Sequence, residues 1–341
     1  MNGPLIVDVE TTTLTDDDCS ILLNPWVGGV ILFQRNLESV QQCKALIREI
    51  RALRPDLLIT VDQEGGRVRR LTEGVLDVPP MATLAADFDD APERVLGRIR
   101  ATCAVMAHEL DELGFDLTWA PVADLDRGLN EVIGHRAFGA DPRKVAQCVQ
   151  AAAEGLLLAG FCPVLKHFPG HGGVTVDTHV GMAQDLRPLA EIGSEDLVPF
   201  RDALAVLPRA GVMLSHVQVP ALEAVPAALS SAWVRYLRET LGFEGPVVTD
   251  DLGMQGAGPQ KAGDRVVRAL SAGADVVLLC NDRKGVYDAL RRLDELDNLP
   301  DEAGSAGRRA RLRKHPAQAG NWDKLKQHVE EVLNGRRQHM G

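Results

Sequence analysis

The stretch from Lys166 to His179 brings a lysine, three histidines and an aspartate together in one glycine-rich segment, directly after an apolar run over residues 161–165. Burying titratable groups without partners costs several kcal/mol each, so packing in a core does not explain them. Glycines at 170, 172 and 173 permit backbone conformations that other residues avoid. Functional residues are concentrated in loops that a rigid scaffold holds. We therefore expect this loop to carry chemistry.

Two kinds of chemistry fit the loop. His167, His171, Asp177 and His179 could ligate a divalent metal, because imidazole and carboxylate suit zinc or iron. Pro169 and the glycines argue against a helix that would bring the first two histidines together. Alternatively, Asp177 accepts a hydrogen bond from one ring nitrogen of His179 while the other nitrogen moves a proton. We favour this dyad over the metal site and over a purely structural role.

Three further segments place polar groups after apolar runs. Residues 61–70 set carboxylates and arginines around a glycine turn, residues 132–138 add an arginine, and residues 247–254 end in adjacent carboxylates. Side chains alternate along a strand, so Asp250 faces the same way as Val248, and Asp251 faces the other way. Together these groups suit a polyhydroxylated substrate, whose hydroxyls form charge-assisted hydrogen bonds.

The elements that must position these groups alternate along the chain. Short apolar runs between longer helical patterns indicate parallel β/α units. The runs expected to form strands are 5–9, 29–33, 57–61, 116–120, 162–165, 212–215, 246–249 and 275–280. The helical patterns cover 40–53, 94–113, 142–158, 232–241 and 266–272, and Thr15 is expected to cap an acidic helix start.

Each expected strand is followed by a polar side chain: Asp8, Arg35 with Asn36, Asp62, Asp124, Lys166 with His167, His216, Asp250 with Asp251, and Asn281. A barrel gathers all carboxyl ends of its strands into one pocket, whereas an open sheet gathers only those near its switch point. We therefore predict an α/β fold, a single (β/α)8 TIM-like barrel over residues 1–341. A C-terminal helix over about 321–335 is expected to pack on it, and 304–307 is the expected flexible stretch.

Composition limits the partners. A formal net charge of −11 over 341 residues argues against nucleic-acid or anionic-membrane binding. The basic run 308–314 reads as a solvated helix face, and the six scattered cysteines as mostly buried thiols. No run approaches the roughly 18 apolar residues of a membrane span, and no signal peptide is visible, so we expect a cytoplasmic protein.

Seven segments resemble glycoside hydrolase family 3, and within it the bacterial β-N-acetylhexosaminidases of the NagZ type. The resemblance covers residues 4 to about 281, and the KHFPGHG run followed by Asp-x-His is its most specific part. Thr178 and Thr249 stand where serine is expected in the pattern. The matching segments are GGVILFQRN (28–36), VDQEGGRVRR (61–70), WAPVADL (119–125), VIGHRAF (132–138), KHFPGHGGVTVDTH (166–179), VVTDDLGM (247–254) and AGADVVLLCN (272–281).

The resemblance implies a retaining glycosidase that needs no metal or other cofactor. Asp250 would be the nucleophile, and His179, held by Asp177, would be the general acid and base. The residues that would hold a terminal N-acetylglucosamine are Asp62, Arg70, Arg136, Lys166 and His167.

The implied substrate is a small sugar, N-acetylglucosamine β-linked to N-acetylmuramic or 1,6-anhydro-N-acetylmuramic acid, with or without peptide, in cell-wall recycling. Aromatic residues make up only 4% of the chain, which favours a pocket for one sugar over a long cleft. We expect a monomer. Three alternatives stay open: a metal-dependent hydrolase on the same barrel, a sugar-binding protein without turnover, and cleavage assisted by the substrate's own acetamide.

Overall fold

A computed structural model describes residues 3–129, 131–175, 181–296 and 301–339. Each apolar run expected to be a strand forms one strand of a single eight-stranded parallel sheet, in the order β6-β3-β2-β1-β12-β11-β8-β7. The strands are β1 Leu5–Val7, β2 Val27–Leu32, β3 Leu58–Val61, β6 Leu117–Thr118, β7 Val164–Phe168, β8 Gly211–Leu214, β11 Val247–Asp251 and β12 Val276–Leu278.

The two outer strands of this order, β6 and β7, meet through the residues that follow β6. The amide of Val164 donates to the carbonyl of Ala120 at 2.7 Å, and that of Lys166 donates to the carbonyl of Pro121 at 3.2 Å. The amide of Ala123 returns a bond of 2.6 Å to the carbonyl of Lys166. The sheet is therefore a nearly closed barrel, as predicted.

Two apolar cores follow from the alternation of side chains along the strands. One core fills the barrel and includes Ile6, Leu58 and Val248. The other lies between the strands and the helices, and residues such as Leu5 and Val247 belong to it. Val248 thus faces the barrel interior. Because side chains two positions apart on a strand face the same side, Asp250 is expected to face the interior as well.

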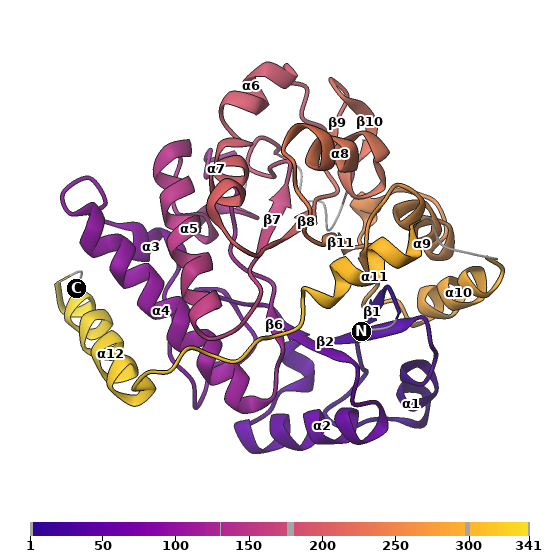
Figure 1. Ribbon diagram of the computed structural model, residues 1–341, viewed down its shortest axis with the longest axis horizontal. Coiled ribbons are helices and arrows are strands. Elements are labelled where there is room, and N and C mark those ends of the chain that lie inside the picture. The colour runs from indigo at the N-terminus through magenta and orange to yellow at the C-terminus, as the bar shows by residue number, and fades with distance from the viewer. Residues whose placement is uncertain (1–2, 130, 176–180, 297–300, 340–341) are drawn as a thin grey trace.

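Helices surround the strands (Figure 1). The predicted helices over 40–53 and 142–158 match α2 and α5 to the residue, whereas the expected helix over 232–241 ends as α8 at Arg235 and continues as a π-helical turn. The helices are α1 Asp16–Leu22, α2 Val40–Leu53, α3 Met81–Ala85, α4 Pro92–Leu113, α5 Pro142–Leu158, α6 Leu189–Ser194, α7 Val198–Val206, α8 Ser231–Arg235, α9 Ala262–Ser271, α10 Arg283–Asp294, α11 Glu302–Ala310 and α12 Trp322–His339.

Two short antiparallel hairpins extend from the barrel. The first, β4 (Gln63–Gly65) with β5 (Val68–Arg69), directly follows β3. The second, β9 (Gln218–Val219) with β10 (Glu223–Pro226), follows β8. Both therefore stand at carboxyl ends of barrel strands, where a barrel carries its site.

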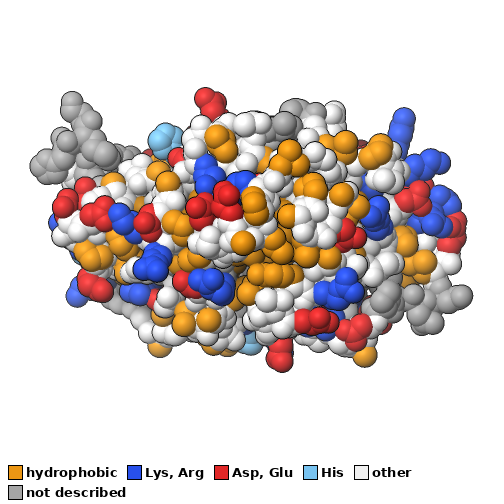
Figure 2. Space-filling view, turned by 90° about the horizontal axis from the view of Figure 1, so that it is seen from above, with side chains coloured by type: hydrophobic (Ala, Val, Ile, Leu, Met, Phe, Trp, Pro, Cys, Tyr) orange, Lys and Arg blue, Asp and Glu red, His pale blue; other side chains and the backbone are white. Residues whose placement is uncertain are grey.

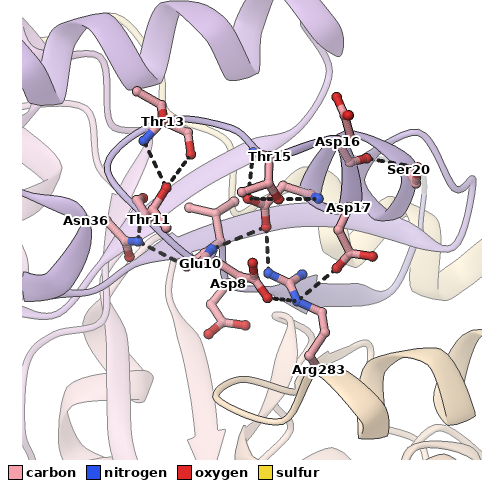
Figure 3. A network of polar contacts seen from close by, with 12 residues as sticks. Asp8, Glu10, Thr11, Thr13, Thr15, Asp16, Asp17, Ser20, Asn36 and Arg283 are labelled. Carbon is pink, nitrogen blue, oxygen red and sulfur yellow. Dashed lines mark hydrogen bonds and ion pairs between the residues drawn. The ribbon is translucent and has the colours of Figure 1, made fainter.

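The loop between β1 and α1 is tied to α10 by a network of polar contacts (Figure 3). Thr15 caps the start of α1 as expected, and Asp18 completes a reciprocal capping box with it. Arg283 of α10 forms ion pairs with Glu10, Asp17 and Asp18. This network joins the first β/α loop to the last strand–helix connection around the barrel.

The prediction of a flexible stretch at 304–307 is wrong, because these residues lie within α11. The prediction of a solvated basic face is also wrong for Arg309, which is 1% exposed. Its guanidinium forms an ion pair with Glu302 and donates to the Ser305 hydroxyl, so the helix carries its own counter-charge. Arg308 pairs with the buried Asp275 at 2.8 Å.

The last helix, α12, lies on the outside of the molecule against α4 (Figure 1). The His108 and Trp322 rings stack with centroids 4.3 Å apart, and Lys326 pairs with Glu109 at 2.7 Å. On these contacts we propose that the chain is one barrel domain with α12 attached to its flank.

Charges of both signs are interspersed on the molecular face seen in Figure 2, with apolar side chains between them. Among the described residues, no helix is long and apolar enough to span a bilayer.

Candidate active site

A cavity of about 330 Å³ lies at the carboxyl ends of the barrel strands. Its apolar lining includes Trp119, Met213 and Leu278, which belong to the core inside the barrel. Its polar lining comes from several different strand ends and the loops after them: Asp62, Glu64, Arg67, Arg70, Arg136, Lys166, His167, His171, Asp250, Asp251 and Asn281. The cavity therefore combines an apolar lining from the barrel core with charged groups from the strand ends.

One wall of the cavity is a chain of ion pairs with alternating sign. Arg70 contacts Asp62 at 3.3 Å, and the second oxygen of Asp62 accepts from Lys166 at 3.0 Å. Lys166 also lies 2.5 Å from Glu64. Glu64 in turn accepts two hydrogen bonds of 2.8 Å from Nε and Nη2 of Arg136. Five charged side chains from β3, β4, β7 and the loops around them thus stabilise one another.

These partners keep the buried wall charged. Burial alone would raise the pKa of Glu64, but the charges of Arg136 and Lys166 and their hydrogen bonds hold it well below its usual value. Burial alone would lower the pKa of Lys166, but Asp62 and Glu64 raise it above its usual value. The carboxylate and the ammonium therefore both stay ionised around neutral pH.

Asp124 fixes the position of His167. Its Oδ2 lies 2.6 Å from Nδ1 of the ring and accepts from the backbone amide of the same histidine at 3.1 Å. Its Oδ1 accepts from the amide of His171 at 2.7 Å. The other ring nitrogen of His167 lies 3.4 Å from Nη2 of Arg136. A buried carboxylate thus sets the ring's orientation at the cavity wall.

Asp250 lies at the end of β11 and lines the cavity. Burial would raise the pKa of its carboxyl, but the imidazoles of His167 and His216 and the amide of Asp251, at 2.8 Å, hold it at about 2. A carboxylate with this pKa is ionised throughout the neutral range, as a nucleophile must be.

Asp251 has a different environment although it is the next residue. Its Oδ1 accepts from the amides of Gly253 at 2.8 Å and Cys280 at 2.9 Å, which supports the turn after β11. Burial raises the pKa of Asp251 to about 7, although these two hydrogen bonds lower it, and the charges of Asp250 and Asp8 add to the rise. Pairing with β12 is irregular between Val248 and Asp251, and Asp251 also lines the cavity.

The structure brings six of the eight residues predicted for the site to this one cavity: Asp62, Arg70, Arg136, Lys166, His167 and Asp250. The other two, Asp177 and His179, lie outside the described residues. Sequence reasoning missed Glu64, which stands in the same segment as Asp62, and the role of Asp124, which it noted only as a strand-end residue.

The metal hypothesis involved His167 and His171, together with Asp177 and His179. Over residues 3–129, 131–175, 181–296 and 301–339, no group of three or more histidine, cysteine, aspartate or glutamate side chains could hold a metal ion. Of the two described histidines, His167 is held by Asp124, and burial lowers the pKa of His171.

Comparison with known proteins gives concordant matches. The glycosyl hydrolase family 3 N-terminal domain matches residues 5–304. A β-hexosaminidase of Thiobacillus denitrificans is 44% identical over 330 residues, 95% of this chain and 90% of its own length. A β-hexosaminidase of Pseudomonas aeruginosa is 42% identical over 303 residues, 88% of this chain and 89% of its own.

Solved structures agree with these sequence matches. NagZ from Neisseria gonorrhoeae, in complex with N-trifluoroacetyl-D-glucosamine, superposes with a TM-score of 0.87 at 36% identity and covers 96% of this chain and 97% of its own. LpqI from M. tuberculosis superposes with a TM-score of 0.79 at 33% identity, with 92% of each chain covered.

The raised pKa of Asp251 predicts a pH-dependent stability difference. Between the pKa of about 3.8 in the unfolded state and the pKa of about 7 in the folded state, the folded protein holds a proton that the unfolded chain has released. The contribution of Asp251 to the free energy of unfolding therefore falls as pH rises through this range. Asp251→Asn is always neutral and keeps an acceptor oxygen. We expect its melting temperature relative to wild type to rise from about pH 4 to pH 7 and then to level off. Calorimetry across this range measures it, and a constant difference would contradict the assignment.

Proposed function

The chain belongs to glycosyl hydrolase family 3 and is a glycoside hydrolase of the β-hexosaminidase type, and on this premise we propose that it removes terminal N-acetylglucosamine from muropeptide fragments. The substrate is N-acetylglucosamine β-1,4-linked to N-acetylmuramic or 1,6-anhydro-N-acetylmuramic acid, with or without peptide. The enzyme acts from the non-reducing end and retains the anomeric configuration.

The observation that carries this proposal is the small cavity with charged walls. At about 330 Å³ it is at the lower end of ligand pockets, which favours one terminal sugar over a stretch of polysaccharide. Asp62 and Arg70 keep 18% and 25% of their side-chain surface exposed, so they have room to bind sugar hydroxyls. The complex of the gonococcal relative with N-trifluoroacetyl-D-glucosamine supports the choice of an N-acylated glucosamine.

In the first step of the proposed reaction, the carboxylate of Asp250 attacks the anomeric carbon. The bond from that carbon to the glycosidic oxygen breaks, and His179 gives its proton to the departing oxygen. In the second step His179 takes a proton from water, the resulting hydroxide displaces Asp250, and the sugar leaves. Asp177 accepts a hydrogen bond from the other ring nitrogen of His179 throughout.

The environment of Asp250 supports its part in this scheme, because a carboxyl with a pKa of about 2 is both ionised and a good leaving group in the second step. Arg136, Lys166 and His167 contribute donors to the sugar, and Asp124 keeps the ring of His167 in place. We further propose that the protein acts as a monomer in the cytoplasm, during recycling of the cell wall, and without a metal.

The test is turnover of 4-nitrophenyl N-acetyl-β-glucosaminide and of the disaccharide with 1,6-anhydro-N-acetylmuramic acid, each with and without a chelator. We expect both substrates to be hydrolysed at rates that the chelator does not change. Loss of activity with chelator would support the metal-dependent alternative. Sugar binding without turnover would support the non-catalytic one.

Replacement of His179 by alanine should lower kcat/KM most for substrates with poor leaving groups. General acid catalysis contributes about 10² to 10⁴ in rate, and a nitrophenolate needs little of it. We expect the loss of kcat/KM on the disaccharide to exceed the loss on the nitrophenyl substrate by about tenfold or more. Equal losses on the two substrates would remove His179 from this role.

Asp250→Asn should abolish formation of the covalent intermediate and leave sugar binding largely intact, whereas Asp251→Asn should reduce the rate only in part. A fluorinated N-acetylglucosamine analogue traps the intermediate, and peptide mapping by mass spectrometry finds the label. Label on Asp250 is expected. Label on Asp251 would reverse the two roles, and no label together with strong inhibition by a thiazoline would indicate assistance by the acetamide.

A further inference from the structure

Glu64 is a buried charged residue to which neither the resemblance nor the reaction scheme gives a part. It lies in β4 of the hairpin after β3, and its side chain is 2% exposed, against 18% for its neighbour Asp62. Both of its oxygens are in use. Oε1 accepts from Lys166 and from Nη2 of Arg136, and Oε2 accepts from Nε of Arg136. Glu64 is therefore saturated by protein cations.

We propose that Glu64 is a positioning residue that sets the places from which Lys166 and Arg136 meet the sugar. This inference rests on the proposed function, since it concerns how the same cavity holds its substrate. Glu64 acts through the two cations and does not itself contact the sugar.

The geometry of Arg136 carries the first half of the proposal. Its paired nitrogens Nε and Nη2 are both engaged by Glu64, and Nη1 donates to the carbonyl of Val132 at 3.0 Å. A bidentate contact fixes the plane of a guanidinium as well as its position. The bidentate edge of Arg136 is therefore occupied by protein, and Nη2 also lies 3.4 Å from Nε2 of His167, which leaves the second hydrogen of Nη1 to meet the sugar.

The surroundings of Lys166 carry the second half. Its side chain is 3% exposed and lies between the carboxylates of Asp62 and Glu64. The charge of Arg136 acts on Lys166 with the same sign, in opposition to those carboxylates. Without Glu64, two buried cations would face each other across an uncharged gap and would be pushed apart. The carboxylate thus keeps both donors close to one another.

The experiment compares wild type with Glu64→Gln, which keeps the shape of the side chain and removes its charge. Asp275→Asn is a matched control, because Asp275 also holds two cations, Arg238 at 2.9 Å and Arg308 at 2.8 Å, but precedes β12 at the other end of the barrel. Glu64→Asp is a second variant that retains the charge on a shorter arm. Circular dichroism checks folding, the disaccharide gives KM and kcat, and calorimetry gives the Kd of N-acetylglucosamine.

For Glu64→Gln we expect KM and Kd to rise about 10- to 100-fold, the effect of losing charged hydrogen bonds, with a much smaller change in kcat. The KM and Kd of Glu64→Asp should lie between those of Glu64→Gln and those of wild type. Asp275→Asn, the control, should melt at a lower temperature than wild type but should keep the KM and Kd of wild type. Because Glu64 acts through Lys166, the losses of Glu64→Gln and Lys166→Met should be less than additive in the double variant.

Unchanged KM and Kd in Glu64→Gln, fully additive losses in the double variant, or equal losses in Asp275→Asn would each overturn the inference. A wild-type protein without turnover would instead overturn the proposed function. In that case, comparing the Kd of N-acetylglucosamine between wild type and Glu64→Gln still measures the effect of Glu64 on sugar binding. The two failures are therefore distinguishable.

Discussion

The carboxylate of Glu64, enclosed between a lysine and an arginine, shows the constraint under which this barrel carries its site. The cavity must present several charges to a small polar ligand, yet most of these charges are withdrawn from water, where isolated ions are very unfavourable. The chain meets this constraint by alternating sign from Arg70 to Arg136 along one wall. Each charge is then stabilised by its neighbours, and the order of the wall depends on every member.

The two aspartates at the end of β11 illustrate how neighbouring positions acquire different chemistry. Asp250 faces imidazoles and a cation and has a pKa of about 2, whereas Asp251 is held by backbone amides near other carboxylates and has a pKa of about 7. Carboxyls whose environments separate their pKa values are suited to different tasks. Both residues line the cavity at an irregular end of the strand, so the polar groups around each carboxyl establish the difference.

Much of this arrangement could be predicted from sequence, for local reasons. The strands are short apolar runs, and polar residues directly after them identify the rim, because a barrel leaves few other places for them. The importance of Glu64 and Asp124 could not be predicted in this way, since their partners lie 72 and 43 residues away. The same applies to α11: glycine and serine at 304–307 indicate flexibility locally, but Arg309 and Glu302 pair when the helix packs on the barrel.

The position of β1 in the sheet has a consequence for how the chain reaches this fold. β1 pairs with β2 on one side and with β12 on the other, through Leu5 and Val277. During synthesis, one edge of the first strand therefore lacks its partner until about residue 278 has emerged. An unpaired apolar edge can pair with the wrong chain, and pairings over long sequence separations form slowly. We infer that this edge of β1 stays without its partner until the segment that forms β12 has been synthesised, and that a chaperone which covers apolar strands would act in that period.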